Sequence, residues 1–403
     1  MKILVIIADC LQVNSSANLC HLAYIQGLLD AGHEVTLLSA DGKDHIIDPS
    51  MTIPSEVIQH TIYGVSLYEK LALRKNSNVN VGAVPTANVA VEPKSPGIKS
   101  RIKTFIRSLY GIHRLRATFV RKAQKFRSDV VYDYILSISD PPASHLLAHN
   151  LLKTGHVHCE HWIQIWEDPW HNDVYGFCSS DEIRKEEGRL LSYAENICYV
   201  SPLTLKNQQE KYSESAHKMY WQPLPFYYKA DDVADADFED NSYGYFGDYA
   251  PAARNLAPFY EAAKDTGIKV NICGNPSDLF AATENISIYP RLPLNQLKPI
   301  EDSTNILVFL CNRVGGQIPG KIYQYSATNK TILFILDGTE EEQEVLSEFF
   351  VKYNRYVFCQ NTRDDIGRAI KLIESRNLGN IKNQPLDEFN PAKTIRNILE
   401  SAK

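Results

Sequence analysis

The chain has 403 residues, of which 44% are hydrophobic and 22% are charged, and its formal net charge is −6. A domain typically holds about 150 residues, so this length predicts two or three domains of ordinary globular composition. No apolar run approaches the roughly 18 to 20 residues of a membrane span, and the apolar start at 1–8 is too short for a signal peptide. We therefore expect a cytoplasmic protein that does not cross a membrane.

Eight cysteines are scattered singly through the chain, without the C-x-x-C spacing of metal or redox sites. Their surroundings are apolar, which is typical of reduced thiols in the core of a cytoplasmic protein. They are Cys10, Cys20, Cys159, Cys178, Cys198, Cys273, Cys311 and Cys359.

The first forty residues predict one βαβ unit. Residues 2–8 form an apolar run, apolar residues recur at helical spacing from Leu19 to Leu29, and 34–39 form a second run after Gly32. A strand, a helix and a strand in this order indicate a parallel sheet. The turn after the first strand lacks the G-x-G-x-x-G pattern, so the sequence predicts no nicotinamide cofactor.

Positive charge is concentrated in residues 94–127. A long loop at about 71–97 leads into this segment and overlaps its first residues. This segment has eleven Lys or Arg residues and no acid, which leaves 31 basic against 48 acidic residues, or −17, for the rest of the chain. Apolar residues at helical spacing from Ile98 to Leu115 predict a basic amphipathic helix. Such a helix either packs on the domain or binds an anionic membrane surface. Nucleic acid is disfavoured because stacking aromatics and a known motif are missing.

A buried strand at 134–138 is followed by Ser139-Asp140-Pro141-Pro142-Ala143-Ser144-His145 and a helix that extends to Leu152. In a parallel α/β sheet the loops after the strand carboxyl ends line the ligand site. His145 is therefore expected in the first turn of a helix at such a site. It either contacts a ligand or transfers a proton there, or it only caps and packs the helix.

The next strand, at 157–165, ends at Trp166-Glu167-Asp168-Pro169-Trp170. Two tryptophans that flank two acids are typical of a sugar-binding surface, because a sugar ring packs on an aromatic face while its hydroxyls bond to carboxylates. A histidine cluster around this strand suggests zinc, but no fitting spacing supplies a third and fourth ligand, so no metal is predicted. The cluster comprises His156, His158, His161 and His171.

A domain boundary is expected at about residue 225. A proline-limited connector at 221–226 and an acidic, solvated run at 231–240 separate two α/β series. The second series opens with a strand at 243–246, and Arg254 follows near a glycine turn at an expected helix start. A guanidinium in that place is suited to a diphosphate, although a single arginine is a weak signal.

The stretch 315–325 joins two apolar runs, 306–310 and 331–336, in the order strand, glycine-rich loop, short helix and strand. Its glycines let the backbone approach a ligand closely, and a helix start at Gly320 offers free N–H groups to a phosphate. The same pattern also fits an ordinary loop before a helix. The candidate donor-binding residues of this domain are Arg254, Gly274, Asn275, Arg313, Gly315, Gly316, Gln317, Ile318, Pro319, Gly320, Lys321 and Gln324.

Three local patterns together resemble the GT-B glycosyltransferases of the retaining group called family 4. Residues 139–145 resemble that group's S-x-P-P-x-S-H element, 167–170 resemble its R-D-P-W element, and 318–325 resemble its P-x-K-x-x-E-Y element. Their order and their βα context extend the resemblance over most of the chain, apart from about 72–127.

The resemblance implies two Rossmann-like, doubly wound α/β domains that face a cleft. Domain 1–225, with a basic insertion at about 94–127, would bind the acceptor, and domain 226–384 would bind the nucleotide-sugar. A helix in 385–403 would pack back on the first domain. The resemblance implies no bound metal or cofactor, because helix dipoles and basic side chains neutralise the diphosphate of a UDP- or GDP-type donor.

The resemblance also assigns roles by position, with His145, Asp168 and Lys321 as the catalytic candidates. His145 and Asp168 would belong to the acceptor side. On the donor side, Lys321 and Arg254 would contact the diphosphate, and Gln324 would contact the ribose.

The chain departs from the family in its donor loop. The family's E-x7-E acids are absent, since Gly316 and Gln324 occupy the two acidic positions, and Asp248 stands where a diphosphate-binding arginine is often found. We expect a glycosyltransferase of bacterial surface-polysaccharide synthesis (capsule, O-antigen or exopolysaccharide) that uses a lipid-linked or saccharide acceptor, in the cytoplasm or at the inner face of the plasma membrane. Two other classes fit: a nucleotide-sugar epimerase, and a non-catalytic glycan-binding protein derived from a transferase.

Overall fold

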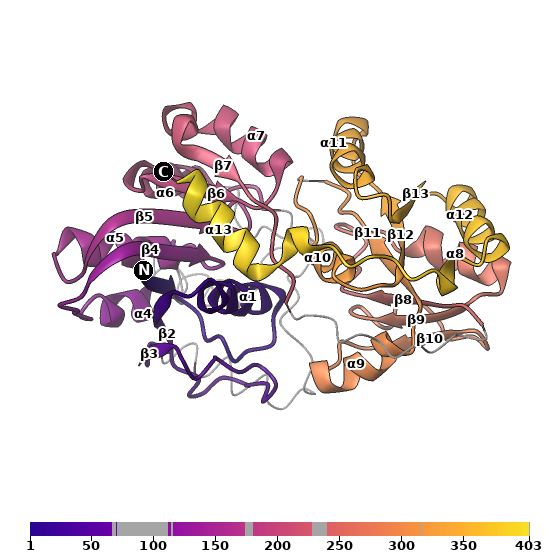
Figure 1. The fold of residues 1–403 in the computed structure, drawn as a ribbon, viewed down its shortest axis with the longest axis horizontal. Coiled ribbons are helices and arrows are strands. Elements are labelled where there is room, and N and C mark those ends of the chain that lie inside the picture. Colours follow the sequence, from indigo (N-terminus) through magenta and orange to yellow (C-terminus); the bar gives the residue numbers. More distant parts are fainter. Residues whose placement is uncertain are drawn as a thin grey trace, which may run out of the picture. The chain divides into compact units, whose positions relative to one another are not determined.

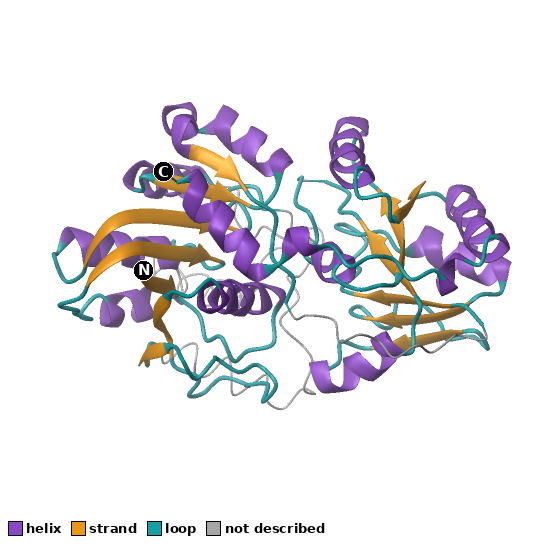
Figure 2. Cartoon of the chain, in the orientation of Figure 1, coloured by secondary structure: helices purple, strands orange, loops and turns teal. Residues whose placement is uncertain are grey.

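The computed structural model describes residues 1–66, 70, 112–113, 116–173, 180–227, 240–314 and 316–402. They form two compact units, which we call unit 1 (Met1–Pro223 with Pro391–Lys403) and unit 2 (Leu224–Asn390). In each unit, parallel strands are flanked by helices (Figure 1, Figure 2). The predicted amphipathic helix at 98–115 lies outside the described residues except for 112–113, and Gly315 also lies outside them.

Unit 1 is built on a seven-stranded parallel sheet with the strand order β3-β2-β1-β4-β5-β6-β7. In its centre, Ile3 of β1 pairs with Val35 of β2 on one side and with Tyr134 of β4 on the other. The strands are β1 (Lys2–Ile7), β2 (Glu34–Ala40), β3 (Ile58–Ile62), β4 (Val131–Ser139), β5 (His158–Trp166), β6 (Asn196–Tyr199) and β7 (Met219–Trp221). The helices are α1 (Ser16–Asp30), α4 (Arg116–Ala123), α5 (Ala143–Lys153), α6 (Asp181–Tyr193), α7 (Pro202–Lys211), the 3₁₀ helix η1 (Ser213–Lys218) and α13 (Pro391–Ser401).

Local sequence explains how the first of these elements begin and end. Strand β1 is buried except at Lys2, as expected for a central parallel strand that helices cover on both faces. Helix α1 begins where the hydroxyl of Ser15 accepts the N–H of Asn18 at 3.1 Å, and Gly32, with φ of +80°, turns the chain after its end.

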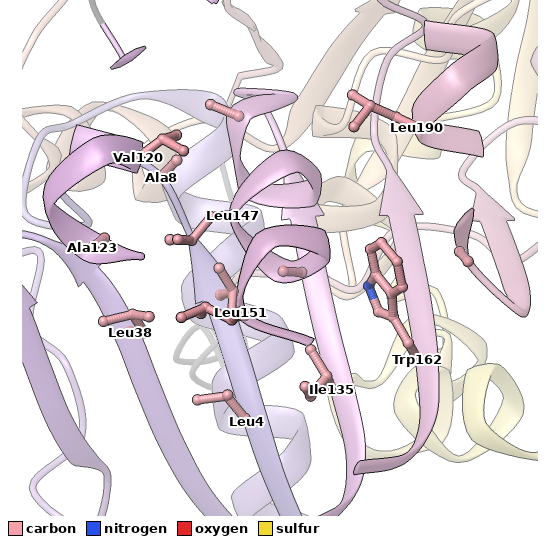
Figure 3. Close-up of a cluster of buried hydrophobic side chains, with 14 of the residues drawn as sticks. Leu4, Ala8, Leu38, Val120, Ala123, Ile135, Leu147, Leu151, Trp162 and Leu190 are labelled. Carbon is pink, nitrogen blue, oxygen red and sulfur yellow. The ribbon is translucent and has the colours of Figure 1, made fainter. Parts of the chain in front are cut away.

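The core of unit 1 includes the packing of α4 and α5 on one face of the sheet (Figure 3). These side chains are at most 4% exposed: Val120 and Ala123 from α4, Leu147 and Leu151 from α5, and Leu4, Leu38, Ile135 and Trp162 from the strands. Helix α4 is the described end of the basic segment, and its Arg121 and Lys122 remain exposed. This part of the segment therefore packs an apolar face on the sheet and exposes its charges.

Unit 2 contains a six-stranded parallel sheet with the strand order β10-β9-β8-β11-β12-β13. The strands are β8 (Ser242–Phe246), β9 (Lys269–Cys273), β10 (Ile286–Tyr289), β11 (Ile306–Leu310), β12 (Thr331–Leu336) and β13 (Tyr356–Gln360). The helices are α8 (Ala257–Thr266), α9 (Leu294–Asp302), α10 (Lys321–Ser326), α11 (Glu340–Val351), α12 (Arg363–Ser375) and the 3₁₀ helices η2 (Leu378–Asn380) and η3 (Asp387–Phe389).

Both sheets have the doubly wound topology. The chain adds the strands of one half of each sheet, returns to the centre and then adds the strands of the other half. The order in which strands are added therefore reverses between β1 and β4 in unit 1 and between β8 and β11 in unit 2. Such a reversal leaves a crevice outside the carboxyl ends of the strands, where ligands bind in open α/β sheets. The predicted fold class, α/β with two Rossmann-like parallel sheets, is confirmed.

Unit 1 is completed by α13, which lies against α1 although the two helices are far apart in the sequence (Figure 1). The contact is close at Gly27, where an added Cβ would lie 2.4 Å from the carbonyl oxygen of Pro391. Ile395 and Ile398 of α13 are fully buried. A residue without a side chain at position 27 therefore lets the two helices approach each other.

We expect Gly27→Ala to destabilise the protein. The added Cβ would meet a backbone atom, and overpacking of this kind costs about 1–3 kcal/mol, whereas alanine gains only about 0.5–1 kcal/mol over glycine inside a helix. Urea unfolding followed by circular dichroism measures the net effect. The matched control is Gly367→Ala in α12, where an added Cβ meets no atom within 4 Å, so stability should rise. Equal effects of the two substitutions would contradict the close α1–α13 contact.

Candidate functional site

The switch point of unit 2 brings together the loops that follow β8 and β11. The first loop begins with Gly247 and Asp248, and the second contains Asn312 and Arg313. Arg254 lies between the first loop and α8, which begins at Ala257 rather than at the expected Arg254. Two of the predicted donor-binding residues, Arg254 and Arg313, therefore lie at the place where a doubly wound sheet binds its ligand.

Hydrogen bonds hold Arg254 in place across the switch point. Its Nε donates to Oδ1 of Asn312 at 2.7 Å, and its Nη1 donates to the carbonyl oxygen of Asp248 at 3.2 Å. Asn312 in turn donates from Nδ2 to the carbonyl oxygen of Gln317 at 3.1 Å. Asn312 thus connects the guanidinium of Arg254 to the glycine-rich loop.

Arg313 supports the same loops from the outside. Its backbone N–H donates to the carbonyl oxygen of Ala253 at 2.9 Å, and its Nη1 donates to the carbonyl oxygen of Pro251 at 3.1 Å. Arg313 is exposed, so its guanidinium remains accessible to an anion while it braces the turn before Arg254.

Asp248 links the ends of three neighbouring strands. Its Oδ1 accepts the backbone N–H of Asn275, after β9, at 3.0 Å, and its Oδ2 lies 3.1 Å from Nη1 of Arg291, after β10. Gly274 packs just below this contact, because an added Cβ would lie 1.9 Å from the carbonyl oxygen of Gly247. The lack of a side chain at Gly274 thus lets the loop after β8 pack against the loop after β9.

The glycine-rich loop is largely buried up to its helix. Gln317 and Ile318 are 7% and 6% exposed, and Gly316 has φ of +68°. Pro319 is also buried, and Gly320 precedes α10, where an added Cβ would lie 2.5 Å from the hydroxyl of Tyr227. Helix α10 has six residues and begins directly after Gly320.

Lys321 and Gln324 have different surroundings on α10. The Nζ of Lys321 lies 3.9 Å from Oε1 of Glu301 on α9, and its side chain is 25% exposed. Gln324 is 1% exposed, and its Oε1 accepts the backbone N–H of Tyr227 at 2.8 Å. The carboxamide oxygen expected to contact a ribose thus holds the start of unit 2, whereas the ammonium of Lys321 remains accessible.

Two buried cations fix α10 from its carboxyl-terminal side. Arg355 is 6% exposed and donates to four carbonyl oxygens, including those of Ser326 at 2.6 Å and Thr328 at 2.9 Å. Lys330 donates to the carbonyl oxygens of Glu301 and Asp302 at the end of α9. Burial lowers the pKa of Lys330 to about 8. These bonds fix the end of α10, the turn that follows it and the end of α9.

In unit 1, the switch point carries an ion pair and a second acid. Asp9 follows β1, and its Oδ1 lies 2.6 Å from Nη2 of Arg116 at the start of α4. Asp140 follows β4 and is exposed.

His145 is fully buried between α5 and β5. Its ring centre lies 4.3 Å from that of Trp166, and its Nδ1 lies 2.8 Å from Oγ of Ser137. The hydroxyl oxygen of Ser137 also accepts the indole N–H of Trp162 at 2.9 Å. Nε2 of His145 has no hydrogen-bond partner among the described residues.

Burial lowers the pKa of His145 to about 3. The imidazole is therefore neutral near pH 7 and is a poor proton acceptor there. This arrangement favours a role in orienting a ligand or the loop over the proton transfer that the sequence left open.

Asp168 and Glu167 follow β5, the neighbour of β4. Asp168 is half-buried, whereas Glu167 is 8% exposed, and its Oε1 lies 3.6 Å from Nε2 of His21 on α1. Burial lowers the pKa of His21 to about 4, and burial together with the charge of Asp168 raises the pKa of Glu167. Although the two groups are at ion-pair distance, burial favours their neutral forms at pH 7.

The loop after β5 is held by a buried carboxylate on α6. Glu187 is 0% exposed and accepts the backbone N–H groups of Trp170 and His171, each at 3.0 Å. It also accepts hydrogen bonds from Gln208 and Tyr212, each at 2.7 Å. Four donors on one carboxylate fix the loop that carries Glu167 and Asp168.

The histidine cluster of the sequence does not form a metal site. His156 bonds through Nδ1 to the carbonyl oxygen of Gln124 at 2.8 Å, and His161 lies 3.2 Å from Glu195. Across the part of the chain that the structure describes, no group of three His, Cys, Asp or Glu side chains is arranged to hold a metal ion. In the same part, no helix is long and apolar enough to cross a bilayer, and the seven described cysteines are free thiols.

No protein-family model and no curated protein matches the chain. Among solved structures, the chain is similar to a sucrose-phosphate synthase from Thermosynechococcus elongatus, with 11% identity, a TM-score of 0.56, and coverage of 100% of this chain and 93% of that one. It is also similar to a glycosyltransferase from Rickettsia africae, with 10% identity, a TM-score of 0.52 and the same coverage. The chain therefore has the GT-B fold of glycosyltransferases.

The structure groups the predicted residues by unit and adds others. Arg254, Asn275, Arg313 and Gln317 lie in one hydrogen-bonded set of loops in unit 2, and His145 and Asp168 lie at neighbouring strands of unit 1. Sequence reasoning assigned no role to several polar residues near these strand ends. These are Asp248, Arg291 and Asn312 in unit 2 and Asp9, His21, Arg116 and Asp140 in unit 1. A place within two residues of the end of a strand would have identified Asp9, Asp140 and Asn312.

We expect His145 to make the protein less stable as the pH falls below about 6.5. The folded state keeps the imidazole neutral down to a pKa of about 3, whereas an unfolded histidine is protonated near pH 6.5. The unfolded state then binds more protons, so the free energy of unfolding falls by up to about 1.4 kcal/mol per pH unit.

Urea unfolding at pH 7 and pH 5 measures this dependence in the wild type and in His145→Gln. The variant should show the smaller loss on acidification. His217→Gln changes an exposed histidine in the same unit and should keep the wild-type dependence. A His145→Gln slope equal to that of the wild type would contradict a buried, neutral His145.

Proposed function

We propose that the protein is a glycosyltransferase that moves a sugar from a nucleoside-diphosphate sugar, of the UDP or GDP type, to a hydroxyl group of a lipid-linked or saccharide acceptor. The observation that carries this proposal is the Arg254 arrangement at the switch point of unit 2, within a GT-B fold. A guanidinium held by Asn312 and by a backbone carbonyl is preorganised for an anion, which is the condition for electrostatic stabilisation of a leaving diphosphate.

Lys321 would supply a second positive charge to the same anion. It lies at the start of α10, directly after the glycine-rich loop that Asn312 connects to Arg254. Glu301 neutralises it in the absence of a ligand, and a bound diphosphate would replace this weak contact at 3.9 Å.

The proposed reaction exchanges one bond at the anomeric carbon for another. The bond between that carbon and the diphosphate oxygen breaks, with its electron pair leaving on the diphosphate, and a bond to the acceptor oxygen forms. The acceptor proton passes to an oxygen of the departing diphosphate, which suits transfer with retention of configuration. Arg254 and Lys321 would stabilise the charge on the leaving group, and His145 would not be required as a base.

Unit 1 would hold the acceptor. Asp168 offers a carboxylate at the end of β5, and the loop that carries it is fixed by Glu187. His145 would orient this region through its stacking on Trp166 and its bond to Ser137. In this proposal Asp168 accepts a hydrogen bond from an acceptor hydroxyl, and alignment of that hydroxyl with the anomeric carbon lowers the barrier.

A lipid-linked acceptor would place the enzyme at the inner face of the plasma membrane, in the synthesis of a capsule, O-antigen or exopolysaccharide. The basic segment 94–127 supports this proposal by its charge. So does a cluster at its described end, where the ammonium groups of Lys43, Lys70 and Lys122 lie 5.7, 5.6 and 5.0 Å from the centre of the Tyr63 ring. Ile46 and Ile47, in the same loop as Lys43, are 47% and 48% exposed. Basic, aromatic and aliphatic groups together suit an anionic bilayer surface.

We expect Lys321→Ala to weaken donor binding and slow transfer. Loss of a charge-assisted contact worth about 1.5–3 kcal/mol corresponds to a roughly 10- to 100-fold decrease in kcat/KM. Transfer assays with the donor varied measure this decrease. A thermal-shift panel of nucleoside diphosphates, in which the preferred one raises the melting temperature, identifies the donor base first.

The control for this variant is Lys371→Ala, which changes an exposed lysine on α12 and should keep wild-type transfer. Unchanged transfer by Lys321→Ala at saturating and at limiting donor would remove the diphosphate role. Release of free, isomerised nucleotide-sugar without any acceptor would favour an epimerase, and glycan binding without turnover would favour a non-catalytic protein.

We also expect the protein to bind vesicles that contain anionic phospholipid and not vesicles of neutral phospholipid alone. Each lysine near an anionic surface contributes about 1 kcal/mol, so Lys43→Glu with Lys122→Glu should reduce flotation with anionic vesicles strongly. Lys352→Glu in unit 2 changes a lysine that also lies over an aromatic ring, 4.4 Å from the centre of Phe349, and should have no effect. Equal, negligible flotation with both kinds of vesicle would remove the membrane proposal.

A further inference from the structure

Arg291 contacts the loop after β8 from the edge of the sheet. It follows β10, the edge strand, yet its Nη1 lies 3.1 Å from Oδ2 of Asp248, which follows the central strand β8. Arg254 donates to the carbonyl oxygen of that same residue at 3.2 Å. Two guanidinium groups therefore contact one residue, Arg291 at its carboxylate and Arg254 at its backbone.

The guanidinium of Arg291 has capacity for a ligand. It carries five N–H donors, and its one hydrogen bond within the described part of the chain is the bond to Asp248. The side chain is 25% exposed, so it is neither buried in the core nor extended into solvent. An ion pair that is partly open to solvent contributes little to stability. The pair of Arg291 and Asp248 extends across the ends of three strands, at the place where a doubly wound sheet binds its ligand.

Asp248 explains why such an arginine is needed. A free carboxylate beside Arg254 would repel a diphosphate, and the pairing with Arg291 cancels that charge. The second carboxylate oxygen is fixed by the backbone N–H of Asn275 at 3.0 Å, so the carboxylate cannot easily turn away. Asp248 thus holds Arg291 in one orientation, as a preorganised second cation next to Arg254.

We infer that Arg291 is a donor-binding residue that contacts the diphosphate of the nucleotide-sugar and that Asp248 positions it. This inference rests on the proposed function and adds a residue to its donor site. It implies that the site recognises a nucleoside diphosphate by two guanidinium groups from the same half of the sheet, in addition to Lys321. A nucleoside monophosphate, which lacks the second phosphate, would gain less from Arg291.

The test compares binding of UDP, GDP, UMP and GMP to the full-length protein by isothermal titration calorimetry. Arg291→Ala should weaken binding of the preferred diphosphate by about 10- to 100-fold, as expected for loss of a charged hydrogen bond, and should change binding of the matching monophosphate by less than about threefold. Arg291→Lys should restore part of the affinity because it keeps the charge. Asp248→Asn should also weaken diphosphate binding, although it removes a negative charge, because Arg291 loses its support.

Arg363→Ala is the matched control, since Arg363 forms an exposed ion pair with Asp265 at 2.5 Å in the same unit, and it should bind both nucleotides as the wild type does. A purely structural ion pair predicts instead that Arg291→Ala lowers the melting temperature and weakens both nucleotides equally, or changes neither, and either result would overturn the inference. A wild type that binds Arg254-dependent ligands of another class but none of the nucleoside diphosphates would overturn the proposed function and this assignment together.

Discussion

The parallel arrangement of the strands is the constraint on which the rest of the structure depends. Because all strands of a sheet run in one direction, all the loops after their carboxyl ends meet at one edge. Residues that are far apart in the chain, such as Arg254 and Asn312, become hydrogen-bonding neighbours there. The reversal of strand order between β8 and β11 leaves a crevice at the carboxyl ends of these strands, and the topology thereby determines where a charged ligand can approach.

The two units use polar groups differently at this edge. Unit 1 buries His145, His21 and Glu167, and burial shifts the pKa of each toward its neutral form. Unit 2 keeps Arg254 and Arg291 partly exposed and braces them with neutral or oppositely charged partners. The first arrangement suits hydroxyl-rich, uncharged groups, and the second suits anions. This contrast supports the proposal that one unit binds the acceptor and the other binds the donor.

Much of the fold could be predicted because buried parallel strands are continuous apolar runs, as β1, β4, β11 and β12 are. Strand β3 gave no such signal, because it is an edge strand whose residues are mostly exposed. The candidate site was harder, since local sequence contains no information on distant partners. The contact between Asp248 and Arg291 joins residues 43 positions apart, and the burial of Gln324 against Tyr227 follows from packing that no motif encodes.

The docking of α13 on α1 bears on how the protein is made. In the sequence, the whole of unit 2 separates the two parts of unit 1. Helix α1 can therefore pack on α13 only after the ribosome has synthesised the residues that follow 390. Until then the face of α1 around Gly27 is exposed. Unit 2 is one continuous segment, and all its strands are synthesised before α13. During synthesis, therefore, the second half of the chain can reach its final structure before the first half is complete.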